Sequence, residues 1–333
     1  MSELRRDRIT GSWVIVAPRR ALRPQVKGRR EQRQNKLHFD PACPFCPGNE
    51  AQLPGIVAET KMQDAPGWRV RVVPNKFPAV QIESEAPIAD ARHQARPAKG
   101  LHEVIIESPW HDVELASMSA TELTVVVGVY RERFRVLLDR DESAAAILFR
   151  NYGHGAGASL VHPHAQIIAL DVVPQRVAAI SEWAKRYHSD YGRCPLCEEL
   201  GVERESGARI VDENAYFVVF VPFAAQHPFE LCLVPKRHQS SFTDLDDQEI
   251  RSFAGLLGRI LTRLNASLGD PPYNFVIESA PKKELAAQYW HWRLRLVPDV
   301  VTWGGFELGS GLPINPSSPE DNARLLREID PGS

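Results

Sequence analysis

Two Cys-x2-Cys motifs, one in each half of the 333 residues, constrain the fold of this chain more than any other feature. The first runs from Cys43 to Cys46 and the second from Cys194 to Cys197. A fifth cysteine, Cys232, lies in an apolar run and is expected to be buried in the core. An odd number of cysteines argues against a disulfide framework, whereas spaced pairs are typical of metal ligands. The motifs therefore predict two metal-binding segments.

The residues after the first motif indicate a mixture of strands and one helix. An apolar run at 103–107 is followed by His111, and Ser119 with Glu122 predicts a capping box at the start of a helix. Apolar residues then recur at helical spacing as far as Leu138. Two strand-like runs follow, at 145–150 and at 160–170, and the second of these contains His162.

The second half repeats this order, which predicts an internal duplication. A strand-like run at 230–234 precedes His238, a helical pattern covers 248–264, and strand-like runs occupy 273–278 and 289–297, the last with His291. His162 follows His111 by 51 residues, and His291 follows His238 by 53. We expect an α+β fold of two tandem halves, residues 1–172 and 173–333. The Pro- and Arg-rich residues 19–33 predict an extended arm, and residues 85–99 a solvent loop.

Each half supplies two cysteines and two histidines, a set that suits tetrahedral Zn²⁺ and leaves no open coordination position. The predicted ligands are Cys43, Cys46, His111 and His162 in the first half, and Cys194, Cys197, His238 and His291 in the second. The alternative is that the cysteines are plain core residues and the histidines form ordinary hydrogen bonds. The repetition favours two structural zinc ions per chain; iron in one site stays open.

His164 stands two residues after a predicted ligand but is not needed by either metal set. In a strand, residues two apart share a face, so His162, His164 and Gln166 are expected to project together. The second half keeps the first histidine as His291 but has Arg293 and Arg295 at the other two positions. This asymmetry predicts a catalytic role for His164, since neutral imidazole can attack a phosphorus centre. The alternative is that His164 is a further metal ligand or a hydrogen-bonded core residue.

Several nearby features would suit a phosphate-bearing substrate. The glycine-rich residues 151–159 can present backbone N–H groups and the Ser159 hydroxyl to phosphate oxygens. Arg19, Arg20 and Arg23 are candidates for neutralising phosphates, although a solvated basic arm explains them equally well.

Composition narrows the class of protein. The net charge of −2 argues against a nucleic-acid binder. The first residues have no apolar core for a signal peptide, and the most apolar stretches are too short to cross a bilayer. We therefore expect a cytoplasmic protein with no membrane or nucleic-acid partner.

The run from His162 to Gln166, downstream of Cys43, Cys46 and His111, resembles the galactose-1-phosphate uridylyltransferase family of the histidine-triad superfamily. Further similarity is found at 11–24, 74–77, 228–230, 235–236, 291–292 and 305–307. The resemblance implies two histidine-triad-like halves, each an antiparallel sheet with helices, usually in a homodimer. It also implies a ping-pong reaction in which His164 takes a nucleotidyl group, uridylyl first, from a nucleotide sugar and passes it to a hexose 1-phosphate.

The resemblance also implies roles for other residues. Gln166 would hydrogen-bond a nonbridging oxygen of the transferred phosphoryl group. The expected nucleotide or phosphate contacts are Asn75, Asn151, Ser159, Arg20 and Arg23. Hydrolytic relatives carry a histidine in place of Gln166, whereas an amide can only orient and stabilise, which favours transfer over hydrolysis.

The chain departs from the best-known members of that family in two ways. Arg293 and Arg295 stand where those members carry histidines, and the second cysteine pair looks like a divergent branch that includes ADP-glucose phosphorylase. The glutamine that holds the hexose phosphate in the family has only Asn315 as a candidate counterpart. An ADP-sugar phosphorylase using the same histidine is therefore the main alternative, and a non-catalytic zinc-knuckle binding protein is a second.

Overall fold

The computed structural model describes residues 2–22, 37–62, 66–83, 93 and 95–330. Its strands are β1 (Glu3–Arg6), β2 (Trp13–Val16), β3 (Ala58–Lys61), β4 (Trp68–Pro74), β5 (Gly100–Ile106), β6 (Ala145–Tyr152), β7 (His164–Leu170), β8 (Ile210–Glu213), β9 (Phe217–Phe220), β10 (Leu231–Pro235), β11 (Tyr273–Glu278), β12 (Arg293–Pro298) and β13 (Ile314–Asn315). Its α-helices are α1 (Ala120–Leu138), α2 (Gln175–Tyr191), α3 (Pro195–Ser206), α4 (Asp247–Leu268), α5 (Gly305–Ser310) and α6 (Pro319–Glu328).

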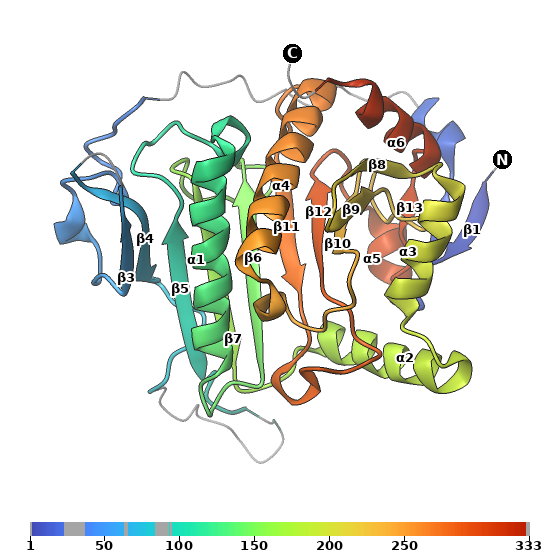
Figure 1. Cartoon of the computed structure of the whole chain (residues 1–333), viewed down its shortest axis with the longest axis horizontal. Helices are drawn as coiled ribbons and strands as arrows, with labels where there is room; N and C mark the ends of the chain where they lie inside the picture. The colour runs from blue at the N-terminus through green and yellow to red at the C-terminus, as the bar shows by residue number, and fades with distance from the viewer. Residues whose placement is uncertain (1, 23–36, 63–65, 84–92, 94, 331–333) are drawn as a thin grey trace.

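A ten-stranded antiparallel sheet runs through the whole molecule (Figure 1). Its strand order is β3-β4-β5-β7-β6-β11-β12-β10-β9-β8, so the second five strands repeat the first five in mirrored order. This arrangement confirms the α+β class and is what a duplicated unit gives. Each half contributes five antiparallel strands, and the pairing of β6 with β11, with Leu148 opposite Ile277, joins the two halves into one sheet. That pairing removes two exposed edges.

The long helices α1 and α4 lie side by side over one face of this sheet (Figure 1). Ala165 and Ile167 of β7 and Leu294 and Leu296 of β12 are buried in the core that these helices cover. Alternate residues point to the other face. His164, Gln166, Arg293 and Arg295 therefore lie on the face opposite α1 and α4, as their spacing predicts.

The strands that carry these residues begin later than predicted. β7 begins at His164 and β12 at Arg293, so His162 and His291 lie in irregular chain just before each strand. Pro163 has no N–H for the ladder, and Trp292 donates its N–H to the Gln239 carbonyl instead of a neighbouring strand. The expectation that His162 belongs to the same strand as His164 and Gln166 is wrong for this reason, although the rings of His162 and His164 both pack against Phe45.

The structure also bears on the expectations for Cys232, the arm, the loop and the division between the halves. Cys232 is fully buried, as predicted. Residues 19–22 of the predicted arm lie in a 3₁₀ turn, η1 (Pro18–Leu22). The rest of the arm, including Arg23, and most of the predicted loop at 85–99 lie outside the described residues. The predicted division at residues 172 and 173 falls between β7 and α2 and stays a prediction. None of the helices in the described part of the chain combines the length and apolar character needed to cross a bilayer.

The capping box predicted at Ser119 is present. The Ser119 hydroxyl accepts from the Glu122 N–H, and the Glu122 carboxylate accepts from the Ser119 N–H. Ser119→Ala is expected to lower the free energy of unfolding by about 1 kcal/mol because α1 loses this cap. Thr121→Ala, on the same exposed turn, is the matched control and should leave stability unchanged or slightly higher. Urea unfolding of both variants checks this, and equal stability would contradict it.

Candidate active site and metal centres

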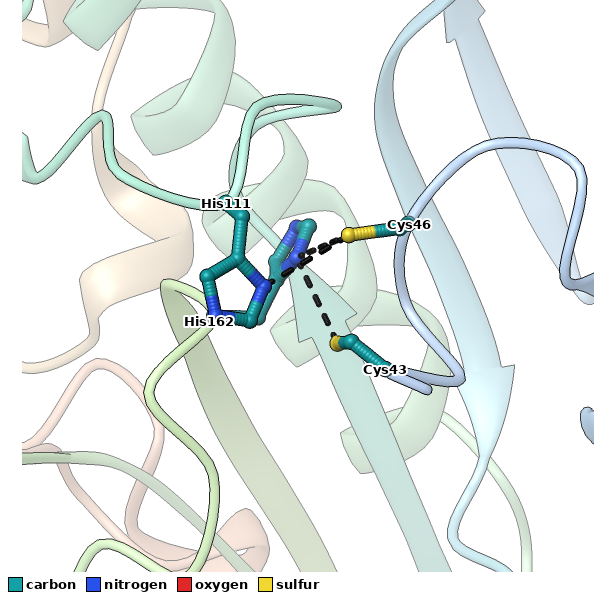
Figure 2. Close-up of side chains that lie close together, drawn as sticks. All are labelled: Cys43, Cys46, His111 and His162. Atoms are coloured by element: carbon teal, nitrogen blue, oxygen red, sulfur yellow. Dashed lines mark hydrogen bonds between the residues drawn. The ribbon is translucent and has the colours of Figure 1, made fainter. Parts of the chain in front are cut away.

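The four predicted ligands of the first half converge (Figure 2). The cysteines lie in the turn before β3, His111 follows β5 and His162 precedes β7. Nδ1 of His162 lies 3.7 Å from Cys43 Sγ and 3.6 Å from Cys46 Sγ, and His111 Nδ1 lies 3.5 Å from Cys46 Sγ. Zinc bond lengths in a tetrahedral site require a sulfur–nitrogen separation of about 3.6 Å. The residues therefore fit a tetrahedral zinc ion.

Neighbouring groups hold the first set in position. His162 Nε2 donates to the Ser108 carbonyl at 2.8 Å, which leaves Nδ1 with its lone pair for a metal. Burial lowers the pKa of His162 to about 4, so the ring is neutral, and burial raises the pKa of Cys43 to about 11. A bound cation would favour the thiolate that burial opposes. The set therefore has the chemistry of a structural metal site.

The second set also converges. Cys194, Cys197, His238 and His291 place their ligand atoms within 4.8 Å of one another. Cys197 Sγ lies 3.2 Å from Nδ1 of both histidines, and His238 Nε2 is 3.2 Å from the Ala287 carbonyl. The hydrogen bond between the two thiols lowers the pKa of Cys194 and raises that of Cys197. Cys197 and His238 are half-buried, so this set lies nearer the surface than the first.

His164 is not a member of either set. It is the first residue of β7, and its exposed fraction is 7%. Its Nδ1 lies 2.8 Å from the His162 carbonyl oxygen, which can only accept, so Nδ1 donates and Nε2 keeps its lone pair. Burial lowers the pKa of His164 below its ordinary value. The Phe45 ring packs edge-on against the imidazole with centroids 5.4 Å apart. This geometry leaves a neutral, oriented Nε2 free to act as a nucleophile.

Gln166 lies two residues further along the same face. Its Oε1 is 2.8 Å from His102 Nε2 and 3.3 Å from Asn75 Nδ2. The structure therefore brings Asn75, a predicted substrate contact, to Gln166. His102 was not singled out from the sequence. One feature of the sequence could have indicated it. His102 is a polar residue on the same face of β5 as the apolar Val104 and Ile106, which lie opposite Gln166 and His164.

The glycine-rich segment, residues 151–159, includes the end of β6 and then folds back toward that strand. Gly153 and Gly157 have φ angles of 79° and 87°, which favour glycine. A Cβ on Gly157 would lie 3.8 Å from Asn151 Nδ2, so the segment folds back against that amide. Asn151 is half-buried and Ser159 is exposed.

Two other predicted contacts form no hydrogen bond with His164 or Gln166 in the described part of the chain. Arg20 is half-buried in η1, and no hydrogen bond or ion pair among the described residues joins it to His164 or Gln166. Asn315 is fully buried; its Nδ2 donates to the Ala225 carbonyl and its Oδ1 accepts from the Ser317 N–H. Both polar atoms of the Asn315 amide are hydrogen-bonded to backbone groups. In this structure Asn315 therefore stabilises the fold and is not available to contact a sugar.

The corresponding positions of the second half carry ion pairs. Arg293 Nε lies 2.6 Å from Glu278 Oε2, and Arg295 Nε lies 2.6 Å from Glu230 Oε1. Burial alone would raise the pKa of Glu278, but Arg293 lowers it to about 2. Both guanidinium groups are therefore engaged in ion pairs with carboxylates of the same half. The second half thus has a Cys2His2 set with an ion-paired arginine, and not a histidine, at the position that corresponds to His164.

The sequence of this chain is similar to those of known nucleotidyl-transferring enzymes. Residues 1–174 match the family model described as galactose-1-phosphate uridyl transferase, N-terminal domain. The chain belongs to the galactose-1-phosphate uridylyltransferase family. An ADP-glucose phosphorylase from Arabidopsis thaliana is 36% identical over 332 residues, covering 98% of this chain and 93% of that protein. A galactose-1-phosphate uridylyltransferase from Thermotoga maritima is 29% identical over 339 residues, covering 99% of both.

A solved structure extends the similarity to three dimensions. The crystal structure of an ADP-glucose phosphorylase from Arabidopsis thaliana with bound ADP-glucose superposes with a TM-score of 0.85 at 35% identity, covering 99% of each chain. Family membership confirms the resemblance drawn from the His162–Gln166 run and the expectation of a nucleotidyl-transferring enzyme. Both versions of that expectation, uridylyl transfer and ADP-sugar phosphorolysis, occur among these relatives.

Proposed function

We propose that this member of the family transfers a nucleoside monophosphate between a nucleotide sugar and a hexose 1-phosphate, with His164 as the covalent carrier. The observation that carries the proposal is the hydrogen bond from His164 Nδ1 to the His162 carbonyl, because it leaves Nε2 as the reactive nitrogen. The uridylyl group, transferred between UDP-glucose and galactose 1-phosphate, is the first candidate.

The proposed chemistry has two balanced steps. His164 Nε2 attacks the α-phosphorus, the bond from that phosphorus to the bridging oxygen breaks, and the sugar 1-phosphate leaves with the electron pair. An oxygen of the second sugar 1-phosphate then attacks the same phosphorus, and the N–P bond breaks. The leaving group is a stable anion, so no general acid is needed. The Gln166 amide N–H₂ would stabilise charge on a nonbridging oxygen.

The test is retention of a nucleotidyl group. The purified protein is incubated with UDP-glucose or ADP-glucose, and its mass is measured before and after adding galactose 1-phosphate, glucose 1-phosphate or inorganic phosphate. A gain of one nucleotidyl group on His164 that is discharged by a sugar phosphate supports the proposal. A protein that converts these substrates without any covalent adduct would contradict it.

A second candidate is adenylyl transfer from ADP-glucose to inorganic phosphate by the same histidine. It is favoured by the higher identity to an ADP-glucose phosphorylase and by the second cysteine pair. The incubations above separate the candidates, since the retained group is a uridylyl group in one case and an adenylyl group in the other.

The proposal includes two zinc ions, one held by each Cys2His2 set, in a cytoplasmic homodimer. Asn151, Ser159, Arg20 and Arg23 stay proposed contacts to the nucleotide or phosphate. A metal in the first set would hold the chain around His162, and hence the carbonyl that orients His164. Sedimentation analysis of the purified protein tests the homodimer.

Removing each metal is expected to have different consequences. Cys43→Ser should lose about one metal equivalent and slow nucleotidyl transfer strongly, because the ligand His162 orients His164. Cys194→Ser should also lose about one equivalent, but should destabilise the second half more than it impairs the chemistry. Elemental analysis for zinc and iron, melting temperature and labelling rate check this. Equal loss of labelling in both variants would contradict the assignment.

A further inference from the structure

The orientation of the Gln166 amide is determined by residues on other strands. Gln166 lies on β7, His102 lies on the neighbouring strand β5, and Asn75 follows β4. His102 Nε2 is 2.8 Å from Gln166 Oε1, and Asn75 Nδ2 is 3.3 Å from the same oxygen. The two nitrogens are 3.1 Å apart and converge on one acceptor.

The tautomer of His102 follows from its other contact. The Ala79 N–H donates to His102 Nδ1 at 3.2 Å, so Nδ1 carries a lone pair and the proton is on Nε2. Burial lowers the pKa of His102, which favours this neutral ring. His102 therefore donates through Nε2, and its partner on Gln166 must be the amide oxygen.

The orientation of Asn75 leads to the same result independently. The Phe77 N–H donates to Asn75 Oδ1 at 2.8 Å, which turns the Asn75 N–H₂ group toward Gln166. Two donors, each oriented by a backbone N–H, thus meet Gln166 Oε1. The Gln166 N–H₂ group is left on the opposite side of its amide and free of this network.

We propose that His102 is a positioning residue that holds Gln166 with its N–H₂ group, and not its carbonyl oxygen, toward the transferred phosphoryl group. This inference rests on the proposed function, in which Gln166 donates to a nonbridging oxygen. A reversed amide would present an oxygen to an anionic phosphate and lose the donor where charge develops. His102 itself need not touch the substrate.

The test isolates the bond between His102 and Gln166. His102→Asn places an amide oxygen near the position of Nδ1, so it can still accept from Ala79, but it cannot reach Gln166. His102→Leu removes both bonds and is the second variant. Each is made in the wild-type background and with Gln166→Ala. The rate of nucleotidyl labelling is measured in single turnovers with saturating UDP-glucose or ADP-glucose, alongside metal content.

Both His102 variants are expected to label about 10- to 100-fold more slowly than the wild-type protein with unchanged metal content. In the Gln166→Ala background the same substitutions should change the rate by less than about threefold, because His102 then has no amide to orient. His188→Leu, at a half-buried histidine of α2 outside the network, is the matched control and should label at the wild-type rate.

The outcomes are distinguishable. Equal fold-losses in both backgrounds would mean that His102 acts directly on substrate or through packing, and would overturn this assignment alone. Wild-type labelling rates in both His102 variants would also overturn it. A wild-type protein that takes no label from either nucleotide sugar would overturn the proposed function and this inference together.

Discussion

His164→Ala is expected to abolish retention of a nucleotidyl group, with a loss of transfer rate on the order of 10⁴-fold or more. The substitution removes Nε2, the atom that would form the bond to phosphorus. Metal content and melting temperature should stay close to the wild-type values, because His164 belongs to neither ligand set and its hydrogen bond to the His162 carbonyl is local. Intact mass, elemental analysis and thermal unfolding measure these quantities.

His162→Ala is the matched control two residues away. It removes a ligand atom of the first set, so the variant should lose about one metal equivalent and label slowly through a disordered start of β7. His164→Gly should regain some turnover with added imidazole, since the vacated space would admit a free nucleophile. A His164→Ala protein that loses its metal but keeps the covalent adduct would reverse the two roles.

The second large effect is expected at Arg150, beneath the face that carries the site. Its guanidinium is fully buried and donates to Glu107, Glu114 and the Tyr273 hydroxyl. The Glu107 carboxylate also accepts from the Tyr130 hydroxyl of α1. Arg150→Met should lower the free energy of unfolding by about 3–5 kcal/mol, because it leaves Glu107 as an uncompensated buried charge.

Two comparisons sharpen this expectation. Arg135→Met, which breaks exposed pairs with Glu132 and Asp139, should leave the free energy of unfolding close to the wild-type value, because exposed ion pairs add little to stability. Adding Glu107→Gln to Arg150→Met should recover part of the loss, because no unpaired carboxylate then remains buried. Denaturant unfolding of the three variants measures the differences. An Arg150→Met protein as stable as the Arg135→Met control would contradict the role of the network.

The same network connects stability to the candidate site. Glu107 is followed by Ser108, whose carbonyl accepts from His162 Nε2, and the Glu107 N–H donates to the Pro163 carbonyl. Loss of Arg150 is therefore expected to slow nucleotidyl labelling at temperatures where the variant is still folded. No pattern in the sequence connected Arg150 with Glu107, because the contact joins β6 to the chain after β5.

Features that depend on local periodicity or spacing were predictable from the sequence. The capping box at Ser119, the strand Tyr273–Glu278 and the positions of His164 and Gln166 on one strand face agree with the structure. The convergence of each Cys2His2 set was also predicted from its repeated order. These features follow from helical and strand periods or from ligand chemistry, and both can be read along the chain.

Other features were decided only by the tertiary structure, because they depend on contacts between segments far apart in the chain. It joined β6 to β11 in one sheet, held His162 and His291 outside their strands, and buried Asn315 among backbone groups. It also brought His102 to Gln166 across a strand pairing. The sequence by itself determined which residues form the two Cys2His2 sets and that His164 lies beside the first of them. Strand pairing and burial decided how they are oriented, because hydrogen-bond partners on separate strands leave no periodic signal along the chain.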